Sequence, residues 1–101
     1  MTDIKSTDTF NKTLRSIGPE YTPKVIDGEL CGYRKLNDYY DIEISGMNNN
    51  RIKNQNFSVY VWSIKPSYEI VEKFFQIKSI EELKKILSQI QEKYQNLHQY
   101  K

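Results

Sequence analysis

The apolar positions of the chain first recur with the period of a helix. Near the start of the chain, Phe10, Leu14 and Ile17 follow the i, i+4, i+7 spacing of one helix face. This spacing predicts a short helix over Thr7–Ile17, capped by Ser6 or Thr7. The helix should end at Gly18-Pro19, because glycine and proline do not continue a helix.

From residue 21 to residue 77 the period changes to two, with β-branched and aromatic residues interrupted by turn formers. The alternation predicts antiparallel strands near Thr22–Ile26, Leu30–Leu36, Tyr39–Ser45, Phe57–Ile64 and Tyr68–Gln76. Asn37-Asp38 is suited to a two-residue turn, and Lys65-Pro66-Ser67 to the turn before the last strand. The polar stretch 46–56 has almost nothing to bury, which predicts a mobile loop.

A second helix begins at a Ser-x-x-Glu capping box formed by Ser79 and Glu82. Its apolar stripe runs through Ile80, Leu83, Ile86, Leu87, Ile90, Tyr94 and Leu97. This stripe needs a sheet face as its partner, although the pattern does not say which face. The sequence thus predicts an α+β fold, a single domain over residues 1–101 with frayed ends at 1–5 and 98–101.

Length and composition exclude several classes of protein. A chain of 101 residues is long enough for one domain, and a mean hydropathy of -0.74 leaves no stretch of about 18 apolar residues for a membrane span. The polar start predicts a protein without a secretion signal that stays in the cytoplasm. One cysteine and one histidine exclude a disulfide framework and disfavour a zinc site, so no cofactor or metal is expected.

Candidate catalytic groups are few. His98 stands at the end of the last helix, and Cys31 lies mid-strand, where a free cysteine usually behaves as a small buried hydrophobe. The chain has no Gly-rich phosphate loop, GxSxG, HExxH or CxxC motif. We therefore expect no enzyme, with a small RelE-type endoribonuclease toxin as a minor alternative.

The charge balance disfavours a dedicated nucleic-acid domain. The net charge is +2 and the pI about 8.6, below the value of about 9 typical of such domains. Against this basic background, residues 36–50 hold three acids, Asp38, Asp41 and Glu43, and no base. Asp41 and Glu43 share one face of a strand. They are explained either as the solvated side of that strand or as a recognition patch for a basic partner, and less readily as a metal site.

The strand Phe57–Ile64 is apolar on both faces, which predicts a central position. Core packing is the favoured interpretation for Tyr60 and Trp62. The alternative is that they present aromatic anchors to a protein or stack on nucleotide bases.

Four segments together suggest a family: Gly32-Tyr33-Arg34-Lys35, Tyr40-Asp41-Ile42-Glu43-Ile44-Ser45-Gly46, Tyr60-Val61-Trp62 and Ile77-Lys78-Ser79-Ile80-Glu81-Glu82-Leu83. In layout the chain resembles the small immunity proteins of bacterial contact-dependent growth inhibition and related polymorphic toxin systems. The resemblance implies an antiparallel sheet, one or two helices and no catalytic set. It also implies a cytoplasmic protein that binds one cognate toxin domain, commonly a nuclease, and blocks its active site or substrate entry.

On this resemblance the partner-binding residues are Asp38, Tyr39, Asp41, Glu43, Asn48, Asn49, Asn50, Arg51, Tyr60 and Trp62. The acids would steer a basic nuclease surface, and Tyr39 with the asparagine loop would supply directional hydrogen bonds. A nucleic-acid-binding module and a small phage- or plasmid-encoded inhibitor stay open as alternatives, and so does the oligomeric state.

Overall fold

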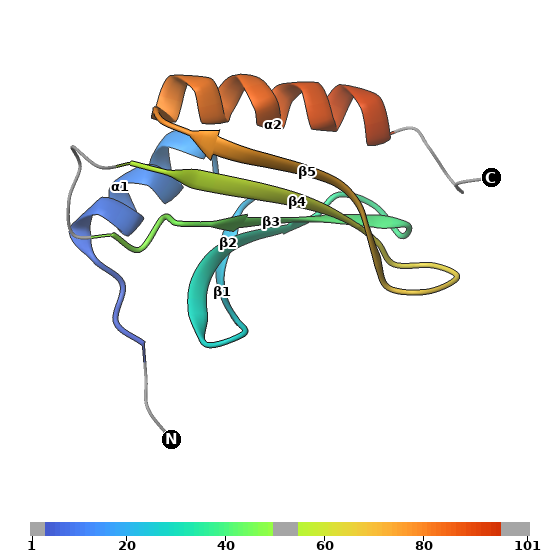
Figure 1. Cartoon of the computed structure of the whole chain (residues 1–101), viewed down its shortest axis with the longest axis horizontal. Coiled ribbons are helices and arrows are strands. Elements are labelled where there is room, and N and C mark those ends of the chain that lie inside the picture. The colour runs from blue at the N-terminus through green and yellow to red at the C-terminus, as the bar shows by residue number, and fades with distance from the viewer. Residues whose placement is uncertain (1–3, 50–54, 96–101) are drawn as a thin grey trace.

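A short helix, five strands and a longer helix follow one another along the chain, as the hydrophobic pattern predicts. The structure is a computed structural model, and it describes residues 4–49 and 55–95. Its elements are α1 (Asp8–Ile17), β1 (Thr22–Ile26), β2 (Glu29–Lys35), β3 (Tyr40–Ser45), β4 (Phe57–Ser63), β5 (Glu69–Ile77) and α2 (Ile80–Tyr94). The predicted α+β fold is confirmed (Figure 1).

The strands form one antiparallel sheet in the order β1-β2-β3-β4-β5, so each strand pairs with its neighbour in sequence. Asp27 and Gly28 join β1 to β2 with φ angles of 52° and 79°, the left-handed values that a two-residue hairpin turn requires. The turn between β2 and β3 is longer than predicted. The side chain of Asn37 holds it, since Oδ1 accepts from the N–H groups of Tyr39 and Tyr40 at 2.8 and 3.0 Å.

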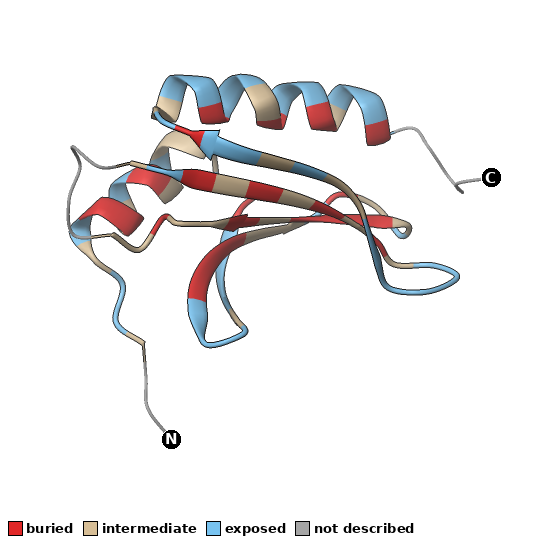
Figure 2. Ribbon diagram, in the orientation of Figure 1, coloured by how far each residue is buried: buried red, intermediate tan, exposed pale blue. Residues whose placement is uncertain are grey.

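Both helices lie on the same face of the sheet (Figures 1 and 2). The buried residues of α2 lie on its side toward the strands (Figure 2), and the core that they form with the sheet also includes Phe10 of α1. On the strands this core contains Ile42, Ile44, Val59 and Val61, each 0% exposed. We call this side of the sheet the covered face and the opposite side the uncovered face.

The start of α2 differs in one detail from the predicted capping box. Ser79 Oγ accepts from the N–H of Glu82 at 3.1 Å, as the motif predicts. The Glu82 carboxylate, however, accepts from the N–H of Lys78 at 3.1 Å rather than from that of Ser79. The glutamate thus holds the residue before the cap, and the helix still begins at Ile80.

Residues 4 and 5, part of the segment 1–5 predicted to be frayed, make contacts with the rest of the chain. Ile4 packs against the core, and Asn48 holds the adjoining backbone. Its Nδ2 donates to the carbonyl of Lys5 at 3.0 Å, and its Oδ1 accepts from the N–H of Thr7 at 2.8 Å. Residues 1–3 and 98–101 lie outside the described residues.

The stretch 46–56 has more to bury than its polar composition suggested. Met47 is 0% exposed and packs over Gly32, where an added Cβ would lie 2.8 Å from the Met47 sulfur. Gly46 has a φ of 84° and donates its N–H to Glu29 Oε2 at 2.7 Å. The expectation that this stretch has almost nothing to bury overlooked Met47, and residues 50–54 of the predicted mobile loop lie outside the described residues.

Candidate functional site

Aromatic and acidic side chains alternate across the uncovered face. In the strand register Glu43 of β3 lies between Tyr33 of β2 and Tyr60 of β4. One step along, Asp41 is opposite Trp62, which in turn is opposite Ile70 of β5. No helix packs on this face within the part of the chain that the structure describes.

Two irregularities in β5 add apolar surface to the same face. Between the pairs Val61/Glu72 and Trp62/Ile70, and again between Phe57/Ile77 and Val59/Phe74, β5 contains one extra residue. Such bulges reverse which side of the sheet the following residues face. As a result Phe75, 56% exposed, packs edge-on against Tyr60 with ring centroids 5.9 Å apart.

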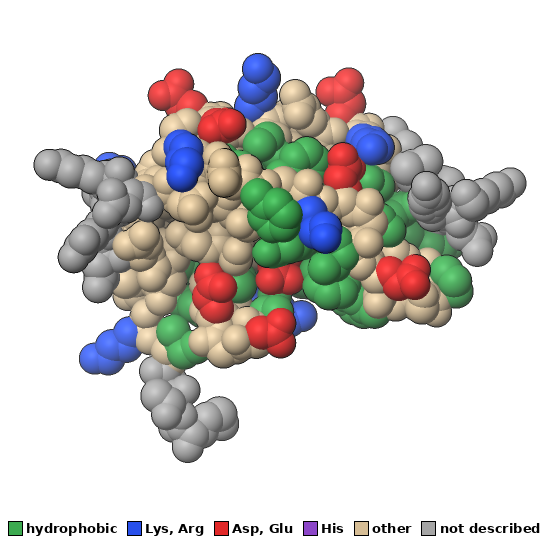
Figure 3. All heavy atoms as spheres, viewed as in Figure 1, with side chains coloured by type: hydrophobic (Ala, Val, Ile, Leu, Met, Phe, Trp, Pro, Cys, Tyr) green, Lys and Arg blue, Asp and Glu red, His purple; other side chains and the backbone are tan. Residues whose placement is uncertain are grey.

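Two adjoining hollows of about 330 and 320 Å³ lie along this face. Both are lined by Ile26, Asp27, Glu43 and Trp62, so they form one groove. Its outer wall is the end of the β1–β2 hairpin, which bends away from α2 in Figure 1. Figure 3 shows hydrophobic surface over the middle of the molecule, with several acidic side chains below it.

The innermost group of the first hollow is Asp41, which is only 1% exposed. Its Oδ2 accepts from the hydroxyl of Tyr33 at 2.9 Å and from the hydroxyl of Tyr68. Its Oδ1 is buried and has no hydrogen-bond partner among the described residues. Burial, followed by the hydrogen bond to Asp41 and its charge, raises the pKa of Tyr33 to about 12, so this hydroxyl stays protonated near neutral pH.

Glu43 links the two hollows. Its Oε1 accepts from Trp62 Nε1 at 2.9 Å. Burial raises the pKa of Glu43, and the negative charges of Asp27, Glu29 and Asp41 raise it further, against the opposing effect of the Trp62 hydrogen bond. The environment of this carboxylate therefore disfavours its negative charge.

The groove carries the opposite charge to the whole chain. Four acids and one base line it, a net charge of −3, against +2 for the protein. The base is Lys24, whose Nζ lies 4.1 Å from the ring centroid of Tyr33. On the other side of the hollow Trp62 and Tyr68 meet edge to face with centroids 5.1 Å apart. The groove is thus an acidic depression with aromatic walls.

The structure brings together four of the predicted partner-binding residues: Asp41, Glu43, Tyr60 and Trp62 line the groove. Two interpretations of them are wrong. Asp41 is not on a solvated strand side, because the tyrosines cover it. Tyr60 and Trp62 are not in the core, since they lie half-buried on the uncovered face.

The other predicted residues lie elsewhere. Asp38 is exposed in the β2–β3 turn, where its carboxylate lies 3.6 Å from Lys35 Nζ, and Tyr39 of the same turn packs against the core. Asn48 holds the segment before α1, and with Asn49 it lines a separate hollow. Asn50, Arg51 and His98 lie outside the described residues.

Sequence reasoning did not select Tyr33, Tyr68, Ile70 and Phe75 for the site. Tyr33 could have been found from the sequence with the correct register for the β2–β3 hairpin, because that register places it opposite Glu43. Tyr68 follows a turn, and no local pattern connects it with Asp41.

The site offers little for nucleophilic or metal chemistry. Burial, and then the charges of Glu29, Glu43 and Asp27, raise the pKa of the Cys31 thiol to about 12, so it is protonated near neutral pH. Within residues 4–49 and 55–95 there is no cluster of three or more His, Cys, Asp or Glu side chains that could hold a metal ion. Over the same ranges neither helix is long and apolar enough to cross a membrane.

Comparisons of the chain with protein-family models, with curated proteins and with solved structures give no match. The groove is therefore the basis for a functional assignment.

Proposed function

We propose that this chain is a binding protein that uses its uncovered sheet face to hold a basic protein domain, and that this partner is a bacterial toxin domain which the chain neutralises. The observation that supports the proposal is the acidic, aromatic groove in an otherwise slightly basic chain. The groove supports the basic partner. The family resemblance supports a toxin, in particular a nuclease.

The surface has the composition of a protein-binding site. Large hydrophobic side chains are exposed at its border, with Tyr68 at 55%, Ile70 at 41% and Phe75 at 56%. Exposed apolar groups that gather beside polar ones are typical of interaction surfaces, and Trp and Tyr are the residues most often found at binding hot spots. A stable complex would bury about 1,200 to 2,000 Å² in total.

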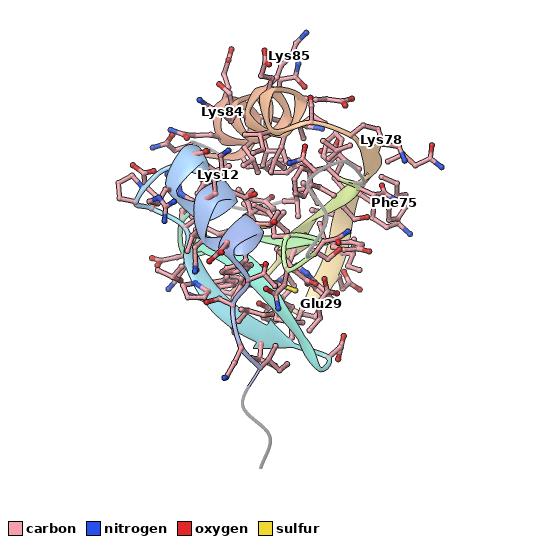
Figure 4. All side chains as sticks on the ribbon, turned by 90° about the vertical axis from the view of Figure 1, so that its left-hand side faces the viewer. Lys12, Glu29, Phe75, Lys78, Lys84 and Lys85 are labelled. Carbon is pink, nitrogen blue, oxygen red and sulfur yellow. The ribbon has the colours of Figure 1, made fainter. Side chains whose placement is uncertain are left out.

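The sign of the charge selects the partner. A nuclease domain carries positive charge where it holds phosphates, and an acidic groove would attract that surface and accelerate association. The same acids would repel an oligonucleotide. Among basic side chains, Lys24 lines the groove and Lys73 is opposite Tyr60, whereas Lys84 and Lys85 lie on the outer side of α2 (Figure 4). The groove therefore supports a protein partner over nucleic acid.

The test is to co-express the chain with the protein encoded immediately upstream of its gene. We expect that neighbour to arrest growth when expressed alone, and to be harmless and co-purify as a stable complex with this chain. A harmless neighbour, or a toxic one that this chain neither binds nor neutralises, would refute the proposed function.

A matched pair of variants locates the interface. Ile70→Lys adds one positive charge at the border of the groove, and Gln89→Lys adds the same charge at an exposed position of α2. We expect the first variant to weaken the complex at least about tenfold by calorimetry, through repulsion and lost apolar contact, and the second to leave it unchanged. Circular dichroism checks that both variants fold. Loss of binding only in Gln89→Lys would place the interface on the helices.

A further inference from the structure

We infer that the first hollow, between Tyr33, Trp62 and Tyr68, is a receptor for a single organic cation, an ammonium or guanidinium group carried by a partner side chain. The source of the cation rests on the proposed function. The chemistry of the hollow does not, since it follows from the groups that line it.

The unpartnered oxygen of Asp41 is the first argument. A buried polar atom without a hydrogen bond costs free energy, and such atoms are rare in folded proteins. Tyr33 and Tyr68 both donate to Oδ2, which leaves Oδ1 without a donor among the described residues. Because Asp41 lines the hollow, a ligand that enters it can supply that donor.

The charge of the hollow is the second argument. Glu43 lines the same hollow and, like Asp41, carries a carboxylate. Two carboxylates on one side of a small depression favour a donor that is also positively charged, because hydrogen bonds between oppositely charged groups are about twice as strong as neutral ones. Neutral or anionic ligands would leave this negative charge uncompensated.

The aromatic walls are the third argument. Cations are attracted to the faces of Trp and Tyr rings, and the attraction grows when the site is shielded from water. The chain itself provides an example, since Lys24 Nζ lies 4.1 Å from the Tyr33 ring centroid. Among the described residues Lys24 forms no ion pair with either carboxylate, so neither negative charge is neutralised by this lysine in an ion pair.

The hollow has room for a side-chain head group. The hollow measures about 330 Å³, at the lower end of the range for small-molecule sites, about 300 to 1,000 Å³. A guanidinium group fits the site better than an ammonium group, because it is planar, stacks on aromatic rings and presents several N–H donors.

The site can be tested without the partner, because Trp62 is the one tryptophan of the chain and its indole N–H lies in the groove. We would titrate the ¹⁵N-labelled protein with propylguanidinium, propylammonium and propylurea, and follow the indole signal. Propylurea has nearly the shape of propylguanidinium without its charge. We expect saturable shifts with both cations, stronger with propylguanidinium, and none with propylurea.

Asp41→Asn should weaken propylguanidinium binding by about tenfold, since it removes the charge while keeping the size of the side chain. Asp38→Asn makes the same chemical change at an exposed acid outside the groove, and should leave the affinity unchanged. If Asp41→Asn does not fold, Glu43→Gln replaces it, because a glutamine oxygen can still accept from Trp62. Lys24→Met should strengthen binding, since it removes the base at the mouth of the hollow.

Equal binding of propylurea, or an unchanged affinity in both groove variants, would overturn the cation site. Failure of the proposed function can be distinguished from failure of the cation site. If no cation binds but Ile70→Lys still disrupts the toxin complex, the face binds its partner without this receptor. If the cations bind and the upstream protein does not, the receptor stands and its partner is a different basic protein.

Discussion

The two faces of the sheet carry different kinds of side chain. On the covered face, alternate residues of β3 and β4 are aliphatic and fully buried, with Ile42, Ile44, Val59 and Val61 at 0% exposure. On the uncovered face, the residues between them are the acids and aromatic rings of the groove. Because neighbouring residues of a strand face opposite sides of the sheet, the same two strands carry an apolar core surface on one side and a polar, half-buried surface on the other.

The electrostatic environments differ in the same way. Glu72 on the covered side accepts from Tyr94 Oη at 2.7 Å and from Lys93 Nζ at 3.1 Å, both from α2. Burial alone would raise the pKa of Glu72, but these hydrogen bonds and the lysine charge lower it overall. The pKa of Glu43 is raised, because its neighbours are other acids. The carboxylate on the covered side is paired with a lysine, whereas the acids of the groove form no ion pair among the described residues.

The largest predicted difference between the faces concerns stability. Leu83→Ala removes a fully buried side chain from the covered side and should lower the free energy of unfolding by about 2 to 5 kcal/mol. Phe75→Ala, on the uncovered face, should lower it by less than about 1 kcal/mol, because the ring is 56% exposed. Urea denaturation measures both. Equal losses would mean that the uncovered face also belongs to the core.

A smaller effect is expected at the buried carboxylate. Tyr68→Phe removes one of the two hydroxyl donors to Asp41 and should cost about 1 to 3 kcal/mol, the range for hydrogen bonds to charged groups. Tyr60→Phe is the matched control, because its hydroxyl forms no hydrogen bond among the described residues and should be dispensable. A near-zero cost for Tyr68→Phe in urea denaturation would show that Asp41 does not depend on this donor.

The smallest effect, below about 1 kcal/mol for these partly exposed groups, is a pH dependence of opposite sign on the two faces. Glu43, with its raised pKa, contributes stability below its unfolded pKa of about 4.3 and loses it as the pH rises through the folded pKa. Glu72, with its lowered pKa, contributes stability above about pH 4.3 and loses it as the pH falls through the folded pKa.

At pH 7 Glu43→Gln should therefore stabilise the protein and Glu72→Gln should destabilise it. Both differences should shrink as the pH falls toward 3, because acid protonates the carboxylates of both the folded and the unfolded state. Thermal unfolding across this pH range measures them. Differences of the same sign at pH 7 would contradict the contrast between the faces.

The sequence by itself determined the elements and their order. Periodicity and capping are local properties, so the stripe of α2, the Ser79 cap and the alternation in β3 could be recognised within a few residues of each position. For α1 the sequence offered Ser6 or Thr7 as the cap, and the structure has Thr7. The same alternation correctly separated Asp41 and Glu43 from Ile42 and Ile44, even though it could not tell which side the helices cover.

Only the tertiary structure decided what the uncovered face became. The extra residue between Ile70 and Glu72 of β5 places Ile70 and Phe75 on one side, against simple alternation, because bulges depend on pairing with β4. Asp41 is buried because two tyrosine hydroxyls from other parts of the chain meet at its carboxylate. The burial of a side chain and the charges around it depend on residues that are distant in sequence. For that reason the groove exists only in the folded chain.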